Sequence, residues 1–266
     1  MAEQQTVMIS GASSGIGEAL ADQFAQGGYD LVLVARNEAR LLRLAKTLKA
    51  EHGVNVTVEA VDLAKRTAAR ALSGRMTQQS IKIDILVNNA GVLEYGSFVD
   101  INHADHQRII DLNILGLTSL LDYFLPPMIE RRRGKVLNVA SIAAFQPVPS
   151  LATYAASKAY VLSLTESLSE ELKGTGVSIT ALCPGITDTN MVSSAQKKSE
   201  GLTIPRFAIG EVDEVARQGY KACIKGDVLC IPGALNQVVT LAGRTTPKWL
   251  LRRVSGMVGR YSSRQQ

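Results

Sequence analysis

Tyr154 and Lys158 stand four residues apart in the stretch "YAASK", with only Ala and Ser between them. In a helix, positions i and i+4 lie one above the other on the same face, so the phenol and the ammonium would be neighbours. An adjacent ammonium favours the phenolate, so the spacing predicts a lowered pKa for Tyr154 and a proton transfer near neutral pH. On spacing alone, a half-exposed tyrosine and a solvated lysine on an amphipathic helix are the commoner explanation.

A second group of chemically suggestive residues is the glycine-rich stretch "SGASSGIG", which contains Gly11, Gly15 and Gly17. It follows an apolar run and opens a helical pattern. Glycines at such a turn let the backbone approach a pyrophosphate, and the helix N-terminus offers free N–H groups. The spacing is a variant of the dinucleotide fingerprint. A structural turn with incidental glycines is the alternative.

Arg36 lies about 20 residues beyond these glycines, at the end of the next apolar run "LVLVA". A dinucleotide fold places at this point the side chain that reads the adenosine ribose. An acid would bind the 2′-hydroxyl of NAD, whereas the Arg36 guanidinium suits the 2′-phosphate of NADP. We therefore predict NADP. Glu38 could also turn inward, and a solvated Arg36 is the alternative.

The elements that must position these residues follow from hydrophobic periodicity. Short, continuously apolar runs predict buried parallel strands at Val7–Ser10, Leu31–Ala35, Val56–Val61, Ile83–Val87, Val136–Ala140, Val177–Leu182 and Val228–Ile231. Helical patterns lie between them, and several end on Gly. The alternation predicts a single α/β domain over residues 1–243, with a doubly wound, Rossmann-type parallel sheet of about seven strands and helices on both faces.

The composition indicates a soluble globular protein with a large hydrophobic core, since 46% of the 266 residues are hydrophobic and 20% are charged. The first residues lack the pattern of a signal peptide, and no uninterrupted apolar run is long enough for a membrane span, so we expect a cytoplasmic protein. The three cysteines, Cys183, Cys223 and Cys230, show no metal-ligand spacing. We expect free thiols and no metal.

The net charge of +5 is concentrated at the C-terminus, because residues 231–266 contain six basic side chains and no acid. The first 230 residues are nearly neutral, which argues against a nucleic-acid partner. The extension at 244–266 is predicted to contain a basic amphipathic helix that starts at Thr246 and Pro247. Its apolar face either packs on protein or, with Trp249, lies on an anionic membrane.

The motifs together resemble the short-chain dehydrogenase/reductase family over about the first 190 residues. They occur in the family's order: "SGASSGIG" at 10–17, "VDL" at 61–63, "NNAG" at 88–91, Asn113, Ser141, "YAASK" at 154–158 and "CPGITDT" at 183–189. Ser10 stands where the family more often has Thr, which keeps the hydroxyl.

The resemblance implies a catalytic set of Asn113, Ser141, Tyr154 and Lys158. Tyr154 would donate a proton to a substrate carbonyl as a hydride arrives from the nicotinamide, and Lys158 would lower the phenol pKa and bind the nicotinamide ribose. Ser141 would orient the carbonyl, and Asn113 would hold a water that links Lys158 to solvent. A complete set favours an enzyme over a dinucleotide-binding sensor or scaffold.

The resemblance also implies the residues that bind the cofactor. They are Gly11, Ser13, Ser14, Gly15, Ile16 and Gly17 at the turn; Arg36; Asp62 and Leu63 around the adenine; Asn89, Ala90 and Gly91 beneath the adenosine side; Pro184, Gly185, Ile186 and Thr187 around the nicotinamide amide; and Asn113, Tyr154 and Lys158. Asn88 is expected to be structural, and His52, His103 and His106 are expected to be solvated.

The expected function is NADP(H)-dependent reduction of a ketone or aldehyde, with an apolar carbonyl compound or a 3-oxoacyl thioester as substrate. The alternative is an NAD-dependent alcohol dehydrogenase of the same family. A substrate lid is predicted at about 188–210, with Val92, Leu93 and Tyr95 across the cleft from it. Apolar residues on the helices around Asn113 and after Tyr154 exceed one stripe, so a homo-dimer or homo-tetramer is also predicted.

Overall fold

The computed structural model describes residues 4–187, 210–246 and 253, and within the helix that ends at Thr245 it does not describe the side chains at 239, 242, 244 and 245. The predicted lid at 188–210 lies outside the described residues except for Gly210. The predicted helix of the C-terminal extension lies outside them too, except for Thr246 and Arg253.

Seven parallel strands form one sheet in the order β3-β2-β1-β4-β5-β6-β7, which confirms the predicted doubly wound fold. The strands are β1 (Thr6–Ser10), β2 (Asp30–Ala35), β3 (Val56–Ala60), β4 (Ile85–Asn88), β5 (Gly134–Val139), β6 (Val177–Leu182) and β7 (Leu229–Cys230). Each predicted strand is present, and its ends agree to within about two residues. The continuously apolar runs become strands because both faces of the sheet are covered.

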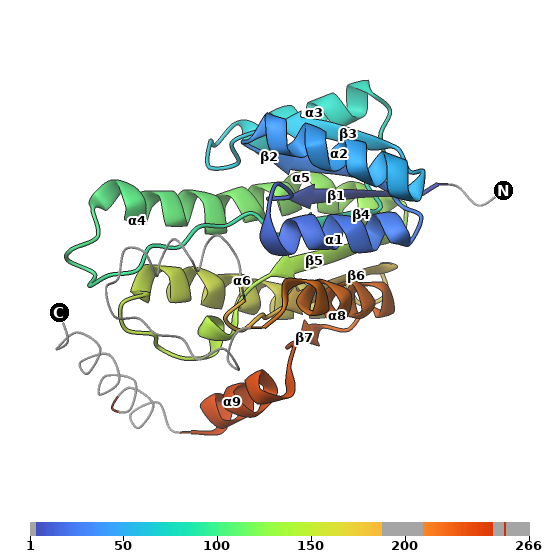
Figure 1. Cartoon of the computed structure of the whole chain (residues 1–266). Coiled ribbons are helices and arrows are strands. Elements are labelled where there is room, and N and C mark those ends of the chain that lie inside the picture. The colour runs from blue at the N-terminus through green and yellow to red at the C-terminus, as the bar shows by residue number, and fades with distance from the viewer. Residues whose placement is uncertain (1–3, 188–209, 247–252, 254–266) are drawn as a thin grey trace.

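Helices cover the two faces of this sheet. They are α1 (Gly15–Gln26), α2 (Glu38–His52), α3 (Ala68–Gln78), α4 (His103–Ile110), α5 (Leu117–Glu130), α6 (Ala152–Glu171), α8 (Val212–Lys225) and α9 (Ala234–Thr245), with a π-helix η1 (Asp111–Gly116) and a 3-10 helix η2 (Ile142–Phe145). One buried cluster joins α1, α2 and α8 to one face of the sheet, and a second joins α3, α5 and α6 to the other face. In Figure 1, α1, α2 and α8 lie on the near side.

The chain reverses its direction across the sheet between β1 and β4. From β1 it adds β2 and β3 on one side, and β4 to β7 follow on the other. In doubly wound sheets the loops at the carboxyl ends of the strands separate at this switch point and leave a crevice for a ligand. The strands run from right to left in Figure 1, so the switch point opens on the left-hand side.

The long helix predicted around Asn113 is interrupted, because the six residues of η1 form a π-helix between α4 and α5. Such insertions concentrate at functional sites because they change the direction in which side chains point. By length and composition alone, His103–Glu130 could cross a membrane, although the sequence showed no uninterrupted apolar run of that length. Helices at the core of a globular protein meet the same criteria, and α5 packs against the sheet in one of the two clusters.

Many of the apolar side chains from which a homo-dimer or homo-tetramer is predicted pack within the chain itself. The structure buries Ile109, Leu117, Leu121, Val161, Leu162 and Leu172. Helices α5 and α6 pack on the sheet in the same apolar layer, and the oligomer stays a prediction. The exposed apolar side chains on α4, α5 and α6 include Ile110, Ile129 and Tyr160.

Candidate active site

The glycine-rich turn joins β1 to α1 and needs glycine for two reasons. Gly11 and Gly15 have φ angles of +68° and +59°, in the left-handed region that side chains disfavour. At Gly17, a Cβ atom would lie 2.3 Å from the carbonyl oxygen of Gly11, so a side chain there would push the helix away from the turn. Ser14 precedes α1 but its hydroxyl does not cap the helix. A helix N-terminus without a side-chain cap fits the pyrophosphate of a dinucleotide.

Ser10 connects this turn to the loop after β4. Its hydroxyl donates to the carbonyl of Val87 and accepts hydrogen bonds from the backbone N–H groups of Asn89 and Ala90 at 3.0 and 3.1 Å. The side-chain amide of Asn89 donates back to the carbonyls of Ser10 and Gly11. The two loops that border the switch point are therefore fixed to each other by short polar contacts.

Asn88 lies one residue earlier and is buried inside the sheet. Its amide donates to the side-chain oxygen of Asn138 at 2.9 Å, and the amide of Asn138 donates to Thr165 on α6. This chain of hydrogen bonds ties β4, β5 and α6 together. The prediction of a structural role for Asn88 agrees with these contacts.

Asn113 lies in η1 and is fully buried, and its side-chain amide makes three hydrogen bonds. The oxygen accepts from the backbone N–H of Val92, and the nitrogen donates to the carbonyl of Val92 and to the hydroxyl of Ser157, at 2.9, 2.9 and 3.0 Å. Ser157 in turn donates to the carbonyl of Tyr154 at 2.7 Å. Asn113 thus connects the loop after β4 to the first turns of α6, and the predicted water-holding role stays a prediction.

Tyr154 and Ser141 come together at the carboxyl end of β5. Ser141 caps η2 by accepting a hydrogen bond from the N–H of Ala143, and its side chain lies close to the phenol of Tyr154. Burial raises the pKa of the Tyr154 phenol above its ordinary value of 10.0, and the polar side chain of Ser141 opposes this shift. Desolvation of the negatively charged phenolate is the larger effect.

Lys158 follows one helical turn after Tyr154 and is buried, with 5% of its surface exposed. Its ammonium donates to the carbonyl of Val139 at 2.8 Å and lies 5.7 Å from the centre of the Tyr154 ring. Burial lowers the pKa of Lys158 from 10.5 to about 8, and the neighbouring Cys183 opposes the shift. Burial likewise raises the pKa of the Cys183 thiol to about 12.

The predicted lowering of the Tyr154 pKa is therefore wrong for the protein without ligand. The i, i+4 spacing does bring the two side chains together, but Lys158 is buried, Tyr154 is partly covered, and desolvation opposes charge on each of them. Spacing alone could not reveal this desolvation, since α6 packs against β5, β6 and η1, which come from other parts of the chain.

The residues predicted to bind the adenosine half of the cofactor include Arg36, Asp62 and Leu63. Arg36 is exposed directly after β2, and the neighbouring Asn37 caps α2 by accepting from the N–H of Arg40. The carboxylate of Asp62 accepts from the N–H of Ala64 and stays partly accessible. Leu63, in contrast, is buried in the core. The expected contacts of Asp62 and Leu63 with the adenine stay predictions.

The predicted nicotinamide loop follows β6. The carbonyl of Pro184 accepts from the N–H of Ile142, which joins this loop to η2 beside Ser141. Thr187 is buried and donates to the carbonyl of Gly185, while Ile186 keeps 38% of its surface exposed. The loop after β6 therefore lies next to the Ser141 side of the site.

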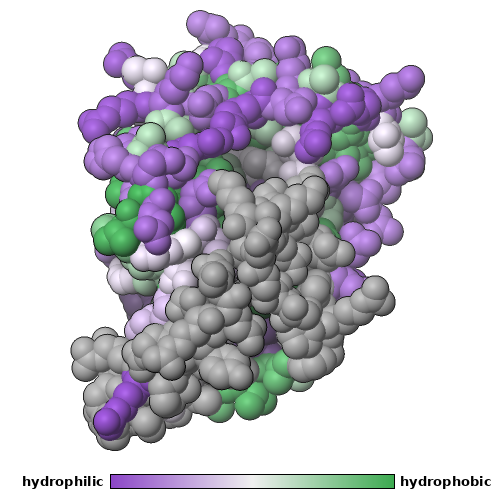
Figure 2. All heavy atoms as spheres, turned by 60° about the vertical axis from the view of Figure 1, so that its left-hand side comes forward, coloured by the Kyte–Doolittle hydropathy of each residue, from purple (hydrophilic) through white to green (hydrophobic). Residues whose placement is uncertain are grey.

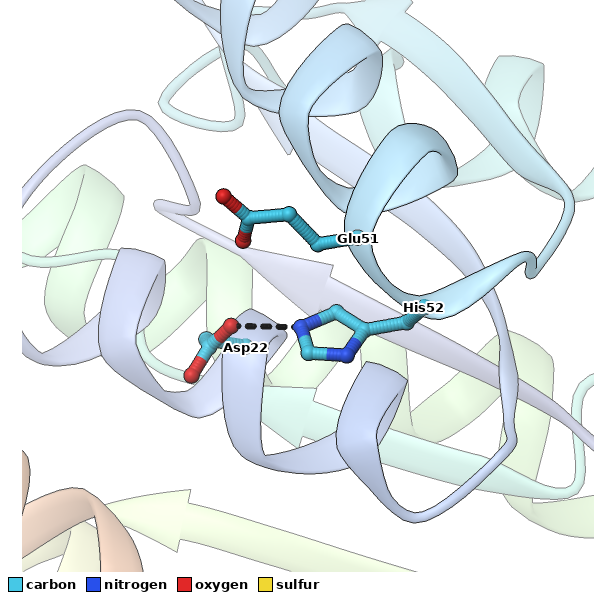
Figure 3. A group of neighbouring side chains, drawn as sticks. All are labelled: Asp22, Glu51 and His52. Carbon is cyan, nitrogen blue, oxygen red and sulfur yellow. Dashed lines mark hydrogen bonds and ion pairs between the residues drawn. The ribbon is translucent and has the colours of Figure 1, made fainter.

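Two of the three histidines differ from the prediction of solvated side chains. The ring of His52 is largely covered and bonds to the carboxylate of Asp22 at 2.8 Å, with Glu51 nearby (Figure 3). This pair joins the last residue of α2 to α1. His106 bonds to the hydroxyl of Thr153 at 2.8 Å and to the carbonyl of Phe98 at 3.0 Å. His103 is exposed, as predicted.

Ser157 is the residue of the site that the sequence did not reveal. In the sequence it is only the serine between Tyr154 and Lys158 in "YAASK". The structure buries it completely and uses its hydroxyl to join Asn113 to the backbone of Tyr154. Its position three residues after Tyr154, where a serine hydroxyl can reach back to the i−3 carbonyl, was the available signal.

Comparisons with known proteins agree with this geometry. The family model described as short chain dehydrogenase matches residues 5–200. An uncharacterized oxidoreductase of Staphylococcus epidermidis is 34% identical over 206 residues, which cover 76% of this chain and 88% of the relative.

Solved structures give the same result. A short-chain dehydrogenase from Sphingobium yanoikuyae in complex with NADPH is 34% identical with a TM-score of 0.81, over 90% of this chain and 92% of that one. A short-chain dehydrogenase/reductase from Burkholderia phymatum in complex with NAD is 25% identical with a TM-score of 0.80, over the same shares of the two chains. The chain belongs to the short-chain dehydrogenase/reductase family of oxidoreductases.

Proposed function

We propose that this protein reduces a ketone or aldehyde to the alcohol with NADPH, and that Tyr154 is the proton donor. The observation that carries the proposal is the convergence of Tyr154, Ser141 and Lys158 at the carboxyl end of β5. This group lies beside the uncapped start of α1 across the switch point. The arrangement combines a proton donor, a group that orients a carbonyl and a site for a pyrophosphate.

The raised pKa of Tyr154 suits a proton donor, because the phenol keeps its proton near neutral pH until a substrate oxygen gains negative charge. The bound cofactor supplies the hydride to the carbonyl carbon. Ser141 donates a hydrogen bond to the same oxygen and holds it toward the phenol. The ammonium of Lys158 stabilises the phenolate that remains after proton transfer, since an opposite charge favours the ionised form.

The preference for NADPH rests on Arg36. Its guanidinium is exposed directly after β2, where it can pair with a 2′-phosphate, and the first acidic residue after it, Glu38, belongs to the first turn of α2. The NADPH complex of the Sphingobium relative supports this choice, whereas the NAD complex of the Burkholderia relative shows that the fold accepts either cofactor.

An apolar substrate fits the described part of the cleft. Val92, Leu93 and Tyr95 follow β4 and are partly buried, and Val92 is held by Asn113 beside the catalytic group. Ile186 offers further apolar surface on the opposite loop. We propose that the substrate is a carbonyl compound with an apolar substituent.

We also propose that copies of the chain pair through the exposed side of α5 and α6. On this side the hydroxyl of Tyr160 forms a hydrogen bond with Thr118.

The test is a panel of ketones, aldehydes and 3-oxoacyl thioesters with NADPH and with NADH, followed by loss of reduced-cofactor absorbance. At least one compound is expected to support turnover with NADPH and much slower turnover with NADH. Comparable rates with both cofactors would refute the assignment of NADPH.

Tyr154→Phe is expected to abolish turnover while cofactor binding, measured by calorimetry, remains. Full turnover by this variant would refute the role of Tyr154. Cofactor binding by the native chain without turnover on any compound would favour a sensor.

A further inference from the structure

His106 lies on α4 and forms hydrogen bonds with both nitrogens of its ring. Its Nε2 lies 3.0 Å from the carbonyl oxygen of Phe98, and its Nδ1 lies 2.8 Å from the hydroxyl of Thr153. Because a carbonyl oxygen can only accept, Nε2 carries a proton, and in the neutral ring Nδ1 then accepts from the hydroxyl. One imidazole therefore joins the chain before α4 to the first turn of α6.

The two partners of His106 belong to segments that border the proposed active site. Phe98 lies in the β4–α4 loop, residues 92–101, which also contains the partly buried apolar residues proposed to contact the substrate. Thr153 lies in the first turn of α6, directly before Tyr154. The bonds of His106 thus connect the substrate side of the site to the turn that carries the proposed proton donor.

The β4–α4 loop is also held at two earlier positions. At its start, the side chain of Asn113 binds both backbone groups of Val92. In its middle, the N–H of Gly96 donates to the carbonyl of Ser150 at 3.0 Å. Ser150 has a φ angle of +65°, which a serine adopts only where its surroundings hold it. His106 is the third point of attachment and the one farthest along the loop.

The far part of this loop is weakly packed. Phe98 and Val99 are 61% and 85% exposed, and the ring of Phe98 lies 4.4 Å from the ring of His106, measured between their centres. The loop and α4 lie on the left-hand side of Figure 1, and Figure 2 brings this side to the front, where apolar patches interrupt a mostly hydrophilic surface. Because exposed side chains contribute little packing, the position of this part of the loop depends on the contacts of His106.

We propose that His106 is a positioning residue that holds the β4–α4 loop against α6 and thereby sets the affinity for the substrate. The inference rests on the proposed reduction of a carbonyl compound beside Tyr154. Helix α6 has its own attachment through Ser157 and Asn113, so loss of the bonds of His106 would release the loop and leave the proton donor in place. The residues predicted to bind the cofactor do not take part in these bonds.

The division between KM and kcat tests this role. His106→Phe keeps an aromatic ring beside Phe98 and removes both hydrogen bonds. The KM for the best carbonyl compound of the panel should rise about five- to tenfold, as the loss of about one net hydrogen bond implies, whereas kcat and the KM for NADPH should stay nearly native. His103→Phe is the matched control at an exposed position of the same helix and should keep native constants. A native KM in His106→Phe would overturn the proposal.

Two milder variants separate the hydrogen bonds from the shape of the ring. Thr153→Val removes only the hydroxyl and should also raise the KM for the carbonyl compound several-fold. His106→Gln offers an amide N–H that can donate to Phe98 in place of Nε2, so it should restore most of the native KM. Circular dichroism and the thermal midpoint would verify that the variants are folded. A KM in His106→Gln as high as in His106→Phe would refute the role of these hydrogen bonds.

Hydrogen exchange tests the attachment of the loop without any substrate. Backbone amides of residues 92–102 should exchange about fivefold faster or more in His106→Phe and in Thr153→Val, while those of α1 should exchange at the native rate. Unchanged exchange in the loop would overturn the inference even if the native chain reduces a carbonyl compound. A native chain without turnover on the whole panel would refute the proposed function instead, and faster exchange in the variants would still support the attachment of the loop by His106.

Discussion

The side-chain amide of Asn113 donates a hydrogen bond of 3.0 Å to the hydroxyl of Ser157, which donates to the carbonyl of Tyr154 at 2.7 Å. The turn of α6 that begins at Tyr154 is therefore attached to the π-helix and, through the two hydrogen bonds between Asn113 and Val92, to the loop after β4. Catalytic groups need such support, since small displacements of a proton donor reduce the rate strongly.

Replacing Ser157 by Ala removes this attachment without touching the atoms that react. We expect kcat to fall roughly tenfold, as the loss of about one buried hydrogen bond implies, with little change in cofactor affinity. Steady-state kinetics and cofactor titration measure both quantities. Ser163→Ala, an exposed position on the same helix, is the control. A native kcat in Ser157→Ala would show that the attachment has no catalytic role.

Lys158→Met is expected to stabilise the ligand-free protein at neutral pH, because burial of the ammonium lowers its pKa to about 8 from 10.5. Between pH 8 and pH 10.5, Lys158 is protonated in the unfolded chain but largely neutral in the folded protein. The free energy of unfolding of the native protein therefore increases as the pH rises through this window, whereas below pH 8 the full cost of burying the ammonium is present. The gain at pH 7 should be on the order of 2 kcal/mol, after loss of the bond to Val139.

Denaturant unfolding of native and Lys158→Met protein between about pH 7 and pH 10.5 measures this difference. The stability difference between the two should shrink as the pH rises. Lys46→Met, which changes an exposed lysine, is the control. A difference that stays constant with pH would contradict the lowered pKa of Lys158.

Arg36→Ala should weaken NADPH binding about tenfold or more and leave NADH binding nearly unchanged, since only NADPH carries the 2′-phosphate. Arg36→Asp should go further and favour NADH, because an acid can bind the 2′-hydroxyl and repels the phosphate. Fluorescence titration with both cofactors gives the ratio. Arg43→Ala, at an exposed position on α2, is the control, and equal losses for both cofactors would exclude recognition of the phosphate by Arg36.

Gly17→Ala should destabilise the protein and weaken dinucleotide binding, because the added Cβ would lie 2.3 Å from the carbonyl oxygen of Gly11 and 2.4 Å from the amide of Asn89. We expect a loss of about 1–3 kcal/mol. Gly74→Ala is the matched control within α3, where nothing lies within 4 Å of the added atom. It should stabilise by up to about 1 kcal/mol. Thermal unfolding distinguishes these opposite signs.

The sequence alone was sufficient for the sheet, the glycine turn and the meeting of Tyr154 with Lys158. These features depend on spacing along the chain, which backbone geometry converts directly into position: continuous apolar runs become covered strands, and residues four apart in a helix become neighbours.

Tertiary packing decided the properties that depend on which distant segments cover a residue. It buried Leu63 and many of the apolar residues of α5 and α6 within the chain, joined Ser157 to Asn113, and left Leu235, Val238 and Leu241 of α9 exposed. It also reversed the sign of the pKa shift predicted for Tyr154. The physical reason is that desolvation depends on every atom around a group, whereas spacing describes only its neighbours along the same helix.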